Sequence, residues 1–290
     1  MKHWKPAAIA ALWSGALYAA PMPVVASFSI LGDVAQQIGG ERVGVQNLVG
    51  ANQDAHAYNL TSGDIKKIRE ARLVLLNGLG LEKAELQRAV KQSKVASAEA
   101  TAGIKPLAAD EHHHEHGHDH DHDHGEFDPH VWNDPVLMQR YAANVAIALI
   151  KADPAGSRYY QQRFKDYQNV LNQLNNYANQ QFGAVAPAKR KVLTGHDSFA
   201  YLGKRYQVKF ISPQGVSSEA EPSARQIAAI IRQIKAENVK AVFTENIKDG
   251  RMIARIAKET GVKVSGGLYA DALSSGAPAG TYADMFRYNV

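Results

Sequence analysis

Short runs of aliphatic and β-branched residues alternate along the chain with stretches in which apolar residues recur every three or four positions. In the first part, strands are expected at 25–30, 43–49, 73–76 and 95–98, and helices near 33–38, 62–70 and 82–91. A second series predicts strands at 192–195, 208–211, 241–244 and 262–266, and helices near 198–205, 222–237 and 250–259. Because β–α–β alternation is typical of parallel sheet, we expect an α/β fold with two lobes.

One long helix is predicted between the two series. Its apolar face consists of residues spaced alternately by four and three positions: Tyr160, Phe164, Tyr167, Leu171, Leu174 and Ala178. Asp153 suits an N-cap, and Pro154 suits the first helical position. A helix over 154–182 would be about 43 Å long at ~1.5 Å per residue, enough to join two lobes as a stiff strut. A helix that lies along one lobe is the alternative that this pattern leaves open.

The first residues are typical of a secretory signal. Lys2 and Lys5 precede an uncharged stretch, and small residues suited to a signal peptidase end at Ala26. We expect cleavage after Ala26, with Ala20 as the other candidate. Prolines shorten the apolar run to about 14 residues, fewer than the ~20 needed to span a bilayer. The expected organisation is therefore a signal at 1–26, a first lobe at 27–153, a linking helix at 154–182 and a second lobe at 183–290.

Charge and cysteine content exclude several classes of protein. Lys plus Arg is 33 and Asp plus Glu is 28, and this small, dispersed surplus does not indicate nucleic-acid binding. The chain has no cysteine, which excludes disulfides, thiolate metal sites and a lipid-modified N-terminal cysteine. With no other long apolar segment, we expect a soluble, monomeric protein that is exported to a Gram-negative periplasm and carries no lipid anchor.

Histidine is concentrated in one segment. Eight of the 12 histidines lie between 110 and 126, together with seven acidic residues. They are His112, His113, His114, His116, His118, His120, His122 and His124. Because the segment has almost no apolar surface to bury, we expect a mobile loop that binds zinc at weak, accessory sites. A tolerated polar insert that transport does not require is the alternative.

Three further histidines and one aspartate occupy comparable places in the two series. His56 and His196 follow predicted strands, His130 precedes a predicted helix, and Asp271 follows the last predicted strand. Open α/β sheets bind ligands at the carboxyl ends of their strands. Three imidazoles and one carboxylate suit tetrahedral Zn²⁺, whereas Mn²⁺ prefers more oxygen ligands. We therefore predict a zinc site formed by these four residues.

Each of these residues, taken singly, could have a simpler role. A lone histidine in a loop is usually a surface or hydrogen-bonding residue, and Asp271 could cap a helix. A hydrolytic zinc centre would need a general base, for which Glu245 is the one candidate, but the chain lacks the HExxH, GxSxG and GxxxxGK[ST] patterns. We therefore expect a binding protein rather than an enzyme.

Several segments resemble the metal-binding subunits of zinc and manganese ABC transporters. They are Ser27 to Asp33, Asp54-Ala55-His56-Ala57-Tyr58, Val74 to Glu82, Asp128-Pro129-His130-Val131-Trp132, His196 to Leu202 and Gly215 to Ser223. The resemblance covers nearly the whole chain after residue 26. It implies two Rossmann-like lobes with largely parallel sheets, one rigid connecting helix, and a metal in the cleft between the lobes. It also implies His56, His130, His196 and Asp271 as the metal ligands.

The resemblance implies a function as well. Such a protein captures Zn²⁺ with high affinity and delivers it to a membrane permease driven by a cytoplasmic ATPase, and a periplasmic zinc chaperone is a further candidate partner. Zinc-type members often have a His-rich acidic loop before the second histidine motif, whereas manganese-type members commonly have Glu where this chain has His196. Ala55, Asn59 and Leu60 depart from the usual first motif. A manganese-type carrier and a stand-alone zinc buffer or chaperone are the alternatives.

Overall fold

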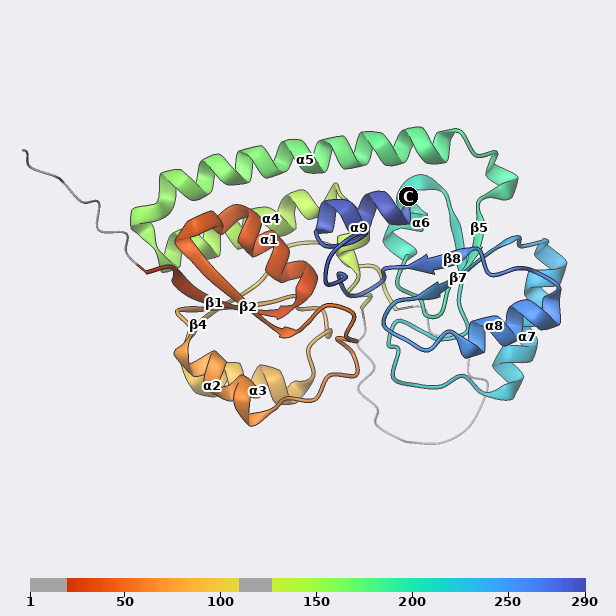
Figure 1. Cartoon of the computed structure of the whole chain (residues 1–290), viewed down its shortest axis with the longest axis horizontal. Coiled ribbons are helices and arrows are strands. Elements are labelled where there is room, and N and C mark those ends of the chain that lie inside the picture. Colours follow the sequence, from red (N-terminus) through yellow and green to blue (C-terminus); the bar gives the residue numbers. More distant parts are fainter. Residues whose placement is uncertain (1–19, 110–126) are drawn as a thin grey trace, which may run out of the picture.

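The computed structural model describes residues 20–109 and 127–290, and it confirms the α/β class. Two four-stranded sheets, all of whose strand pairs are parallel, lie side by side, and one long helix runs along both (Figure 1). In the described part of the chain, no helix combines the length and the apolar character needed to cross a membrane.

The first lobe contains a sheet with the strand order β2-β1-β3-β4. Its elements are β1 (Met22–Phe28), α1 (Ser29–Gly39), β2 (Val43–Val49), α2 (Ser62–Glu70), β3 (Leu73–Leu76), α3 (Ala84–Ser93), β4 (Ala96–Glu99) and α4 (Leu137–Ala152). Short 3-10 turns occur at Gly40–Arg42 and Val131–Asn133. Strands β2 and β3 and helix α2 have the predicted bounds. Helix α1 begins four residues before the predicted position 33, because Ser29 to Leu31 already form its first buried turn.

Strand β1 includes residues that the sequence assigned to the signal. It pairs with β2 from Met22 onward, and it also pairs with β3, so it lies inside the sheet. Val24, Val25 and Ala26 are at most 2% exposed. A cut after Ala26 would therefore remove most of a central strand, whereas a cut after Ala20 leaves it whole. The boundary remains a prediction, and the position of β1 favours Ala20.

The second lobe repeats the strand order of the first, as β6-β5-β7-β8. Its elements are β5 (Lys191–Leu193), α6 (Ala200–Tyr206), β6 (Lys209–Ile211), α7 (Ala224–Glu237), β7 (Ala241–Glu245), α8 (Arg251–Thr260), β8 (Gly266–Leu268) and α9 (Tyr282–Asn289). The prediction of a strand at 262–266 was wrong. Gly261 ends α8 with φ at +71°, and the Val262 N–H donates to the Ala257 carbonyl, so that Val262 closes the helix and β8 begins later.

Helix α5 (Ser157–Gly183) runs along both lobes (Figure 1). The predicted apolar face is present: Tyr160, Tyr167, Leu171, Leu174 and Ala178 are buried, and Phe164 is partly buried. Asp153 does not cap the helix as predicted. Its carboxylate accepts hydrogen bonds from Arg42 and Tyr160, and a 3-10 turn at Pro154–Gly156 precedes α5. The helix begins later because this carboxylate ties it to the first lobe.

One apolar core extends through both lobes. It includes residues of β1, α1, α4 and α5 from the first part of the chain, and also Phe199, Leu202 and Leu268 from the second lobe and Tyr282 and Phe286 from α9. A separate cluster, which we call the outer cluster, consists of Leu193, Ile211, Ile230, Ile234, Val239, Val242, Ile253, Ile256 and Ala257. The inner side of the second lobe thus packs into the same apolar core as the first lobe.

Candidate metal centre

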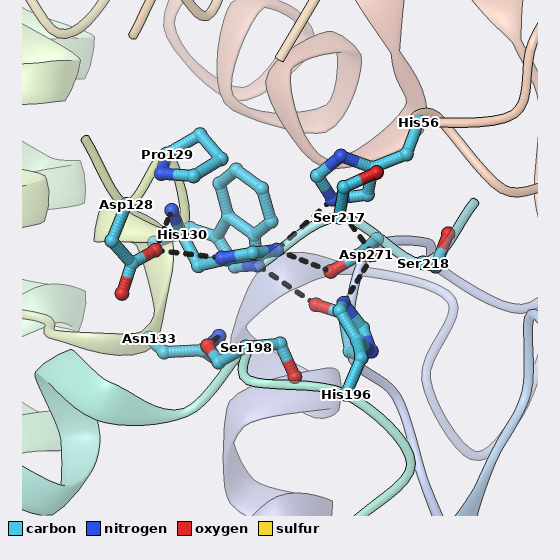
Figure 2. Close-up of polar contacts among 12 residues, drawn as sticks. His56, Asp128, Pro129, His130, Asn133, His196, Ser198, Ser217, Ser218 and Asp271 are labelled. Atoms are coloured by element: carbon cyan, nitrogen blue, oxygen red, sulfur yellow. Dashed lines mark hydrogen bonds and ion pairs between the residues drawn. The ribbon is translucent and has the colours of Figure 1, made fainter. Parts of the chain in front are cut away.

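The four residues chosen from the sequence lie together between the lobes. The Nε2 atoms of His56 and His130 are 3.1 Å apart, and Asp271 Oδ2 lies 3.0 Å from His196 Nε2 and 3.5 Å from His56 Nε2 (Figure 2). Asp271 Oδ1 lies 3.4 Å from His130 Nε2. One ligand atom from each residue lies within 4.8 Å of the other three. The geometry is that of four donors around one small cation.

Each lobe supplies two of these side chains. His56 lies in the loop between β2 and α2, and His130 directly precedes the turn at Val131–Asn133. His196 follows β5 and Asp271 follows β8, at carboxyl ends of strands as predicted. His130, His196 and Asp271 are fully buried, and His56 is 6% exposed. The cleft thus encloses the four side chains almost completely.

Two buried carboxylates hold two of the imidazole rings. Asp128 Oδ1 lies 2.6 Å from Nδ1 of His130 and also accepts the backbone N–H of that residue. Glu245 Oε2 lies 2.6 Å from Nδ1 of His196. With Nδ1 facing a carboxylate, Nε2 of each ring is the nitrogen directed at Asp271, and it offers its lone pair to a cation once it carries no proton. The carboxylates therefore fix both the tautomer and the orientation that metal binding requires.

Sequence reasoning missed these supporting roles. Asp128 stood in the Asp-Pro-His motif, where an aspartate two residues before a histidine was the available signal. Glu245 was named only as a candidate base for a hydrolytic site. Its Oε1 accepts the N–H groups of Gly195 and His196 while Oε2 holds the ring, so the whole carboxylate is occupied on the far side of His196. The geometry makes Glu245 a positioning residue.

Burial and mutual proximity shift the proton equilibria of the cluster. Burial, helped by the neighbouring His130, His196 and Lys248, lowers the pKa of His56 to about 3 against the opposing effect of Asp271. Burial also acts to lower the pKa of His196, but Glu245 and Asp271 together raise it well above its usual value. Burial acts to raise the pKa of Asp271, and the adjacent imidazoles lower it overall. The cluster thus contains a carboxylate anion opposite a ring that must lose a proton to bind a cation.

Several polar atoms of the cluster lack a well-aligned hydrogen bond. Among the described residues, both carboxylate oxygens of Asp271 and Nε2 of His196 are buried without a well-aligned hydrogen bond, although Oδ2 and Nε2 lie 3.0 Å apart. Leaving a buried polar atom unpaired costs roughly 1–3 kcal/mol, and more for a charged group. A cation at the centre would satisfy all three atoms at once. The eight histidines of the predicted accessory loop, between His112 and His124, lie outside the described residues.

The chain matches the family model described as "Zinc-uptake complex component A periplasmic" over residues 24–290. The manganese-binding lipoprotein MntA of Bacillus subtilis is 32% identical in an alignment of 279 positions that covers 93% of this chain and 87% of that protein. The manganese ABC transporter substrate-binding lipoprotein PsaA of Streptococcus anginosus is 27% identical, over 93% of this chain and 87% of that protein.

Solved structures show the same fold. The periplasmic zinc-binding protein TroA of Treponema pallidum is 26% identical with a TM-score of 0.84, over 92% of this chain and 96% of that one. The manganese-bound periplasmic metal-binding protein of Candidatus Liberibacter asiaticus is 29% identical with a TM-score of 0.77, over 92% and 96%. These matches confirm the two-lobed architecture that the sequence resemblance implied.

The predicted location is contradicted by these relatives. We expected an unanchored periplasmic protein, because the chain has no cysteine and an outer membrane would retain it near the cell. Four relatives, however, are named lipoproteins. A lipid anchor keeps an exported carrier at its membrane equally well, so such a carrier does not need an outer membrane to retain it near the cell. The prediction of an unanchored protein was therefore wrong.

The family also determines the class of activity. Its members are solute-binding subunits, which confirms that the protein is not an enzyme and that its partners are an ABC permease and the ATPase that drives it. The metals named among the relatives include manganese, iron and zinc, so the comparisons establish a divalent metal as the cargo without choosing one. With its match from residue 24 to the last residue, the chain belongs to the family of metal-binding substrate-binding subunits of ABC transporters.

Proposed function

We propose that the cargo is Zn²⁺, held by His56, His130, His196 and Asp271. The observation that carries the proposal is the size of the cluster. A tetrahedral zinc with ligands at about 2.0 to 2.1 Å separates its ligand atoms by about 3.3 to 3.4 Å. The Nε2 atoms of His56 and His130 are 3.1 Å apart, and the distances from Nε2 to the nearer Asp271 oxygen are 3.0 Å for His196, 3.4 Å for His130 and 3.5 Å for His56, which bracket that value.

Ligand type supports zinc over manganese. Three neutral imidazoles and one carboxylate suit zinc, while manganese favours sites with more oxygen. The manganese-binding names of several relatives make a manganese-type carrier the second candidate. His196 argues against it, because the ring is buried, backed by Glu245 and directed at Asp271, as a nitrogen ligand must be.

We further propose that the protein captures zinc outside the cytoplasm and passes it to the permease. The proposed parts are those expected from the sequence: a first lobe, a connecting helix at 154–182, and a second lobe at 183–290. The histidines of 110–126 would collect zinc for the central site. A stand-alone buffer would bind zinc equally well but would not support uptake.

A zinc titration of His196→Ala tests the central proposal. Removing this ligand leaves three donors and an uncompensated Glu245, so the affinity for zinc should fall by more than about 100-fold, the upper range for loss of a mere supporting partner. Isothermal calorimetry on protein lacking 110–126 measures the central site alone. The control is Lys66→Ala, whose side chain is 75% exposed. Unchanged affinity in His196→Ala would refute the assignment.

Metal competition on the same shortened protein tests the choice of zinc. Zinc should displace bound manganese at equimolar concentration, and metal analysis of protein purified without chelators should find zinc. A preference for manganese would make the second candidate correct. Growth at limiting zinc of a strain whose protein lacks residues 110–126 tests the role of that segment. Growth equal to that of the parent strain would show that transport does not need the segment.

A further inference from the structure

The four proposed ligands differ in how they are held. The rings of His130 and His196 each donate Nδ1–H to a buried carboxylate. Among the described residues, no side chain bonds Nδ1 of His56. That residue is held instead through its backbone N–H, which donates to Asp54 Oδ1 at 3.0 Å. His56 is therefore the ligand whose ring can turn with the least loss of contacts.

His56 is also the ligand that reaches a cavity. It lines a pocket of about 310 Å³ whose walls come from both lobes. The first lobe contributes residues 79–85, Gln87, Phe127 and Pro129, and the second lobe contributes Val216, Ser217 and Glu219. The other three ligands are 0% exposed and do not line this pocket. An ion in the pocket would meet His56 before any other ligand.

Contacts between the lobes lie across this pocket and beside it. Lys83 Nζ lies 2.7 Å from Glu219 Oε1, with the two side chains 27% and 48% exposed. Next to them, Ser218 Oγ donates to Asp54 Oδ2 at 2.5 Å, and Lys248 donates to the Ser218 carbonyl. The segment 215–221 is thus tied to the loop that carries His56. Moving this segment would open the pocket without separating the lobes.

We propose that this pocket is the route by which the metal ion enters and leaves the site, with His56 as the first ligand bound and the last released. The Lys83–Glu219 pair across the pocket controls the rate of exchange. This inference rests on the proposed function, because it assumes that the four residues bind the ion.

The absence of native cysteine allows a direct test. Ser217→Cys places one thiol in the pocket, and Ser97→Cys, on the exposed strand β4 of the first lobe, is the matched control. Each purified variant is loaded with a bulky maleimide, and zinc association and chelator-driven release are followed by stopped flow. Label at 217 should slow both rates by about tenfold or more, within the range over which association rates of related complexes vary. Label at 97 should change neither.

A second pair of variants tests the closure. Lys83→Ala and Glu219→Ala should each speed zinc release by up to about fivefold, the range expected for a partly exposed ion pair. Lys66→Ala, in an exposed pair on α2, should have no effect.

Equal rates for protein labelled at 217 and at 97 would overturn the proposed route. Equal release rates for Lys83→Ala, Glu219→Ala and the parent protein would overturn the role of the pair. Equilibrium zinc affinity, measured on the same unlabelled samples, separates these failures from failure of the zinc site itself. Intact affinity with unchanged rates contradicts only the route, whereas absent affinity contradicts the proposed function.

Discussion

The two lobes have the same strand order, and in both the inner face of the sheet is stabilised in a different way from the outer face. The first sheet packs into a core that continues through α4 and α5 into the inner side of the second lobe. The outer helices of each lobe pack on a smaller, separate cluster: α7 and α8 on the outer cluster of the second lobe, and α2 and α3 on a first-lobe cluster of Val25, Leu48, Ile68, Val74, Leu76, Leu86 and Val90. Helix α9 belongs to the end of the chain, yet it packs against α1 and α5 (Figure 1).

The shared core, rather than the outer helices, lies next to the metal ligands. It therefore determines the distance between the ligands of the first lobe, His56 and His130, and those of the second lobe, His196 and Asp271. Trp132, next to His130, donates from its indole to the carbonyl of Ala270, next to Asp271. Tyr282 then donates to the carbonyl of Trp132. The shared core therefore holds the two halves of the site together, while the outer cluster supports only the periphery.

The largest expected effect comes from breaking the shared core. Tyr282→Ala removes a fully buried ring and its hydrogen bond, and it should lower the free energy of unfolding by about 3–5 kcal/mol. It should also weaken zinc binding, because the lobes lose a contact next to the site. Ile256→Ala, in the outer cluster, is the control: it should destabilise the protein in denaturant titrations but leave zinc affinity unchanged. An equal loss of zinc affinity in Tyr282→Ala and Ile256→Ala would contradict the distinction between the shared core and the outer cluster.

The supporting carboxylates allow the two halves of the site to be compared directly. Glu245→Gln and Asp128→Asn preserve shape but replace an acceptor of the Nδ1 proton, so each should lower zinc affinity by about 10–100-fold. Calorimetry at pH 7 measures the effect. Similar losses are expected, since both bonds are 2.6 Å long and both carboxylates are buried. A loss confined to one variant would show that the halves contribute unequally.

Acid should affect a helix of the first lobe more than its counterpart in the second. Burial acts to raise the pKa of Asp64, but hydrogen bonds from Thr61, Tyr58 and Lys67 lower it overall to about 2. Because the pKa of Asp64 is lower in the folded than in the unfolded protein, its carboxylate stabilises the fold at pH values above the unfolded pKa of about 3.9. This contribution is lost as the pH falls toward 2. Metal-free protein should lose about 2 kcal/mol there through this group. Asp64→Asn should remove that part of the dependence in denaturant titrations, and an unchanged slope would contradict the assignment.

The smallest effect concerns the matching cap of the second lobe. Ser223 and Gln226 form a neutral capping box on α7, whereas Thr61 and Asp64 form an ionisable one on α2. Ser223→Ala should therefore cost about 1 kcal/mol of stability, by the same amount at pH 4 and at pH 7. Thermal unfolding at both pH values measures this cost, and a cost that changed with pH would show that the cap is coupled to a titrating group.

Much of the fold could be predicted because the local patterns agree with the final packing. Leu73–Leu76 is apolar and buried throughout, as in an inner strand of a parallel sheet, and Val43–Val49 mixes apolar with polar residues, as in a strand at the edge of a sheet. The failures occurred where one hydrogen bond decides how a helix begins or ends. Val262 closes α8 instead of starting a strand, and Asp153 binds Arg42 instead of capping α5.

The grouping of the site residues could also be predicted, since strand ends in parallel sheets gather polar side chains at one edge. His196 and Asp271 follow β5 and β8 in this way. The roles of Asp128 and Glu245 could not be assigned. Glu245 is 49 residues from His196 in the chain, and only the pairing of β5 with β7 brings the two together.

The shared core has a consequence for the transporter. A carrier whose halves are joined by buried side chains presents nearly the same outline whether empty or full. The permease therefore has few large-scale cues by which to tell the two states apart. Recognition of the loaded state must depend on small differences in surface side chains around the cleft, and these side chains are the place to look for discrimination against empty carriers.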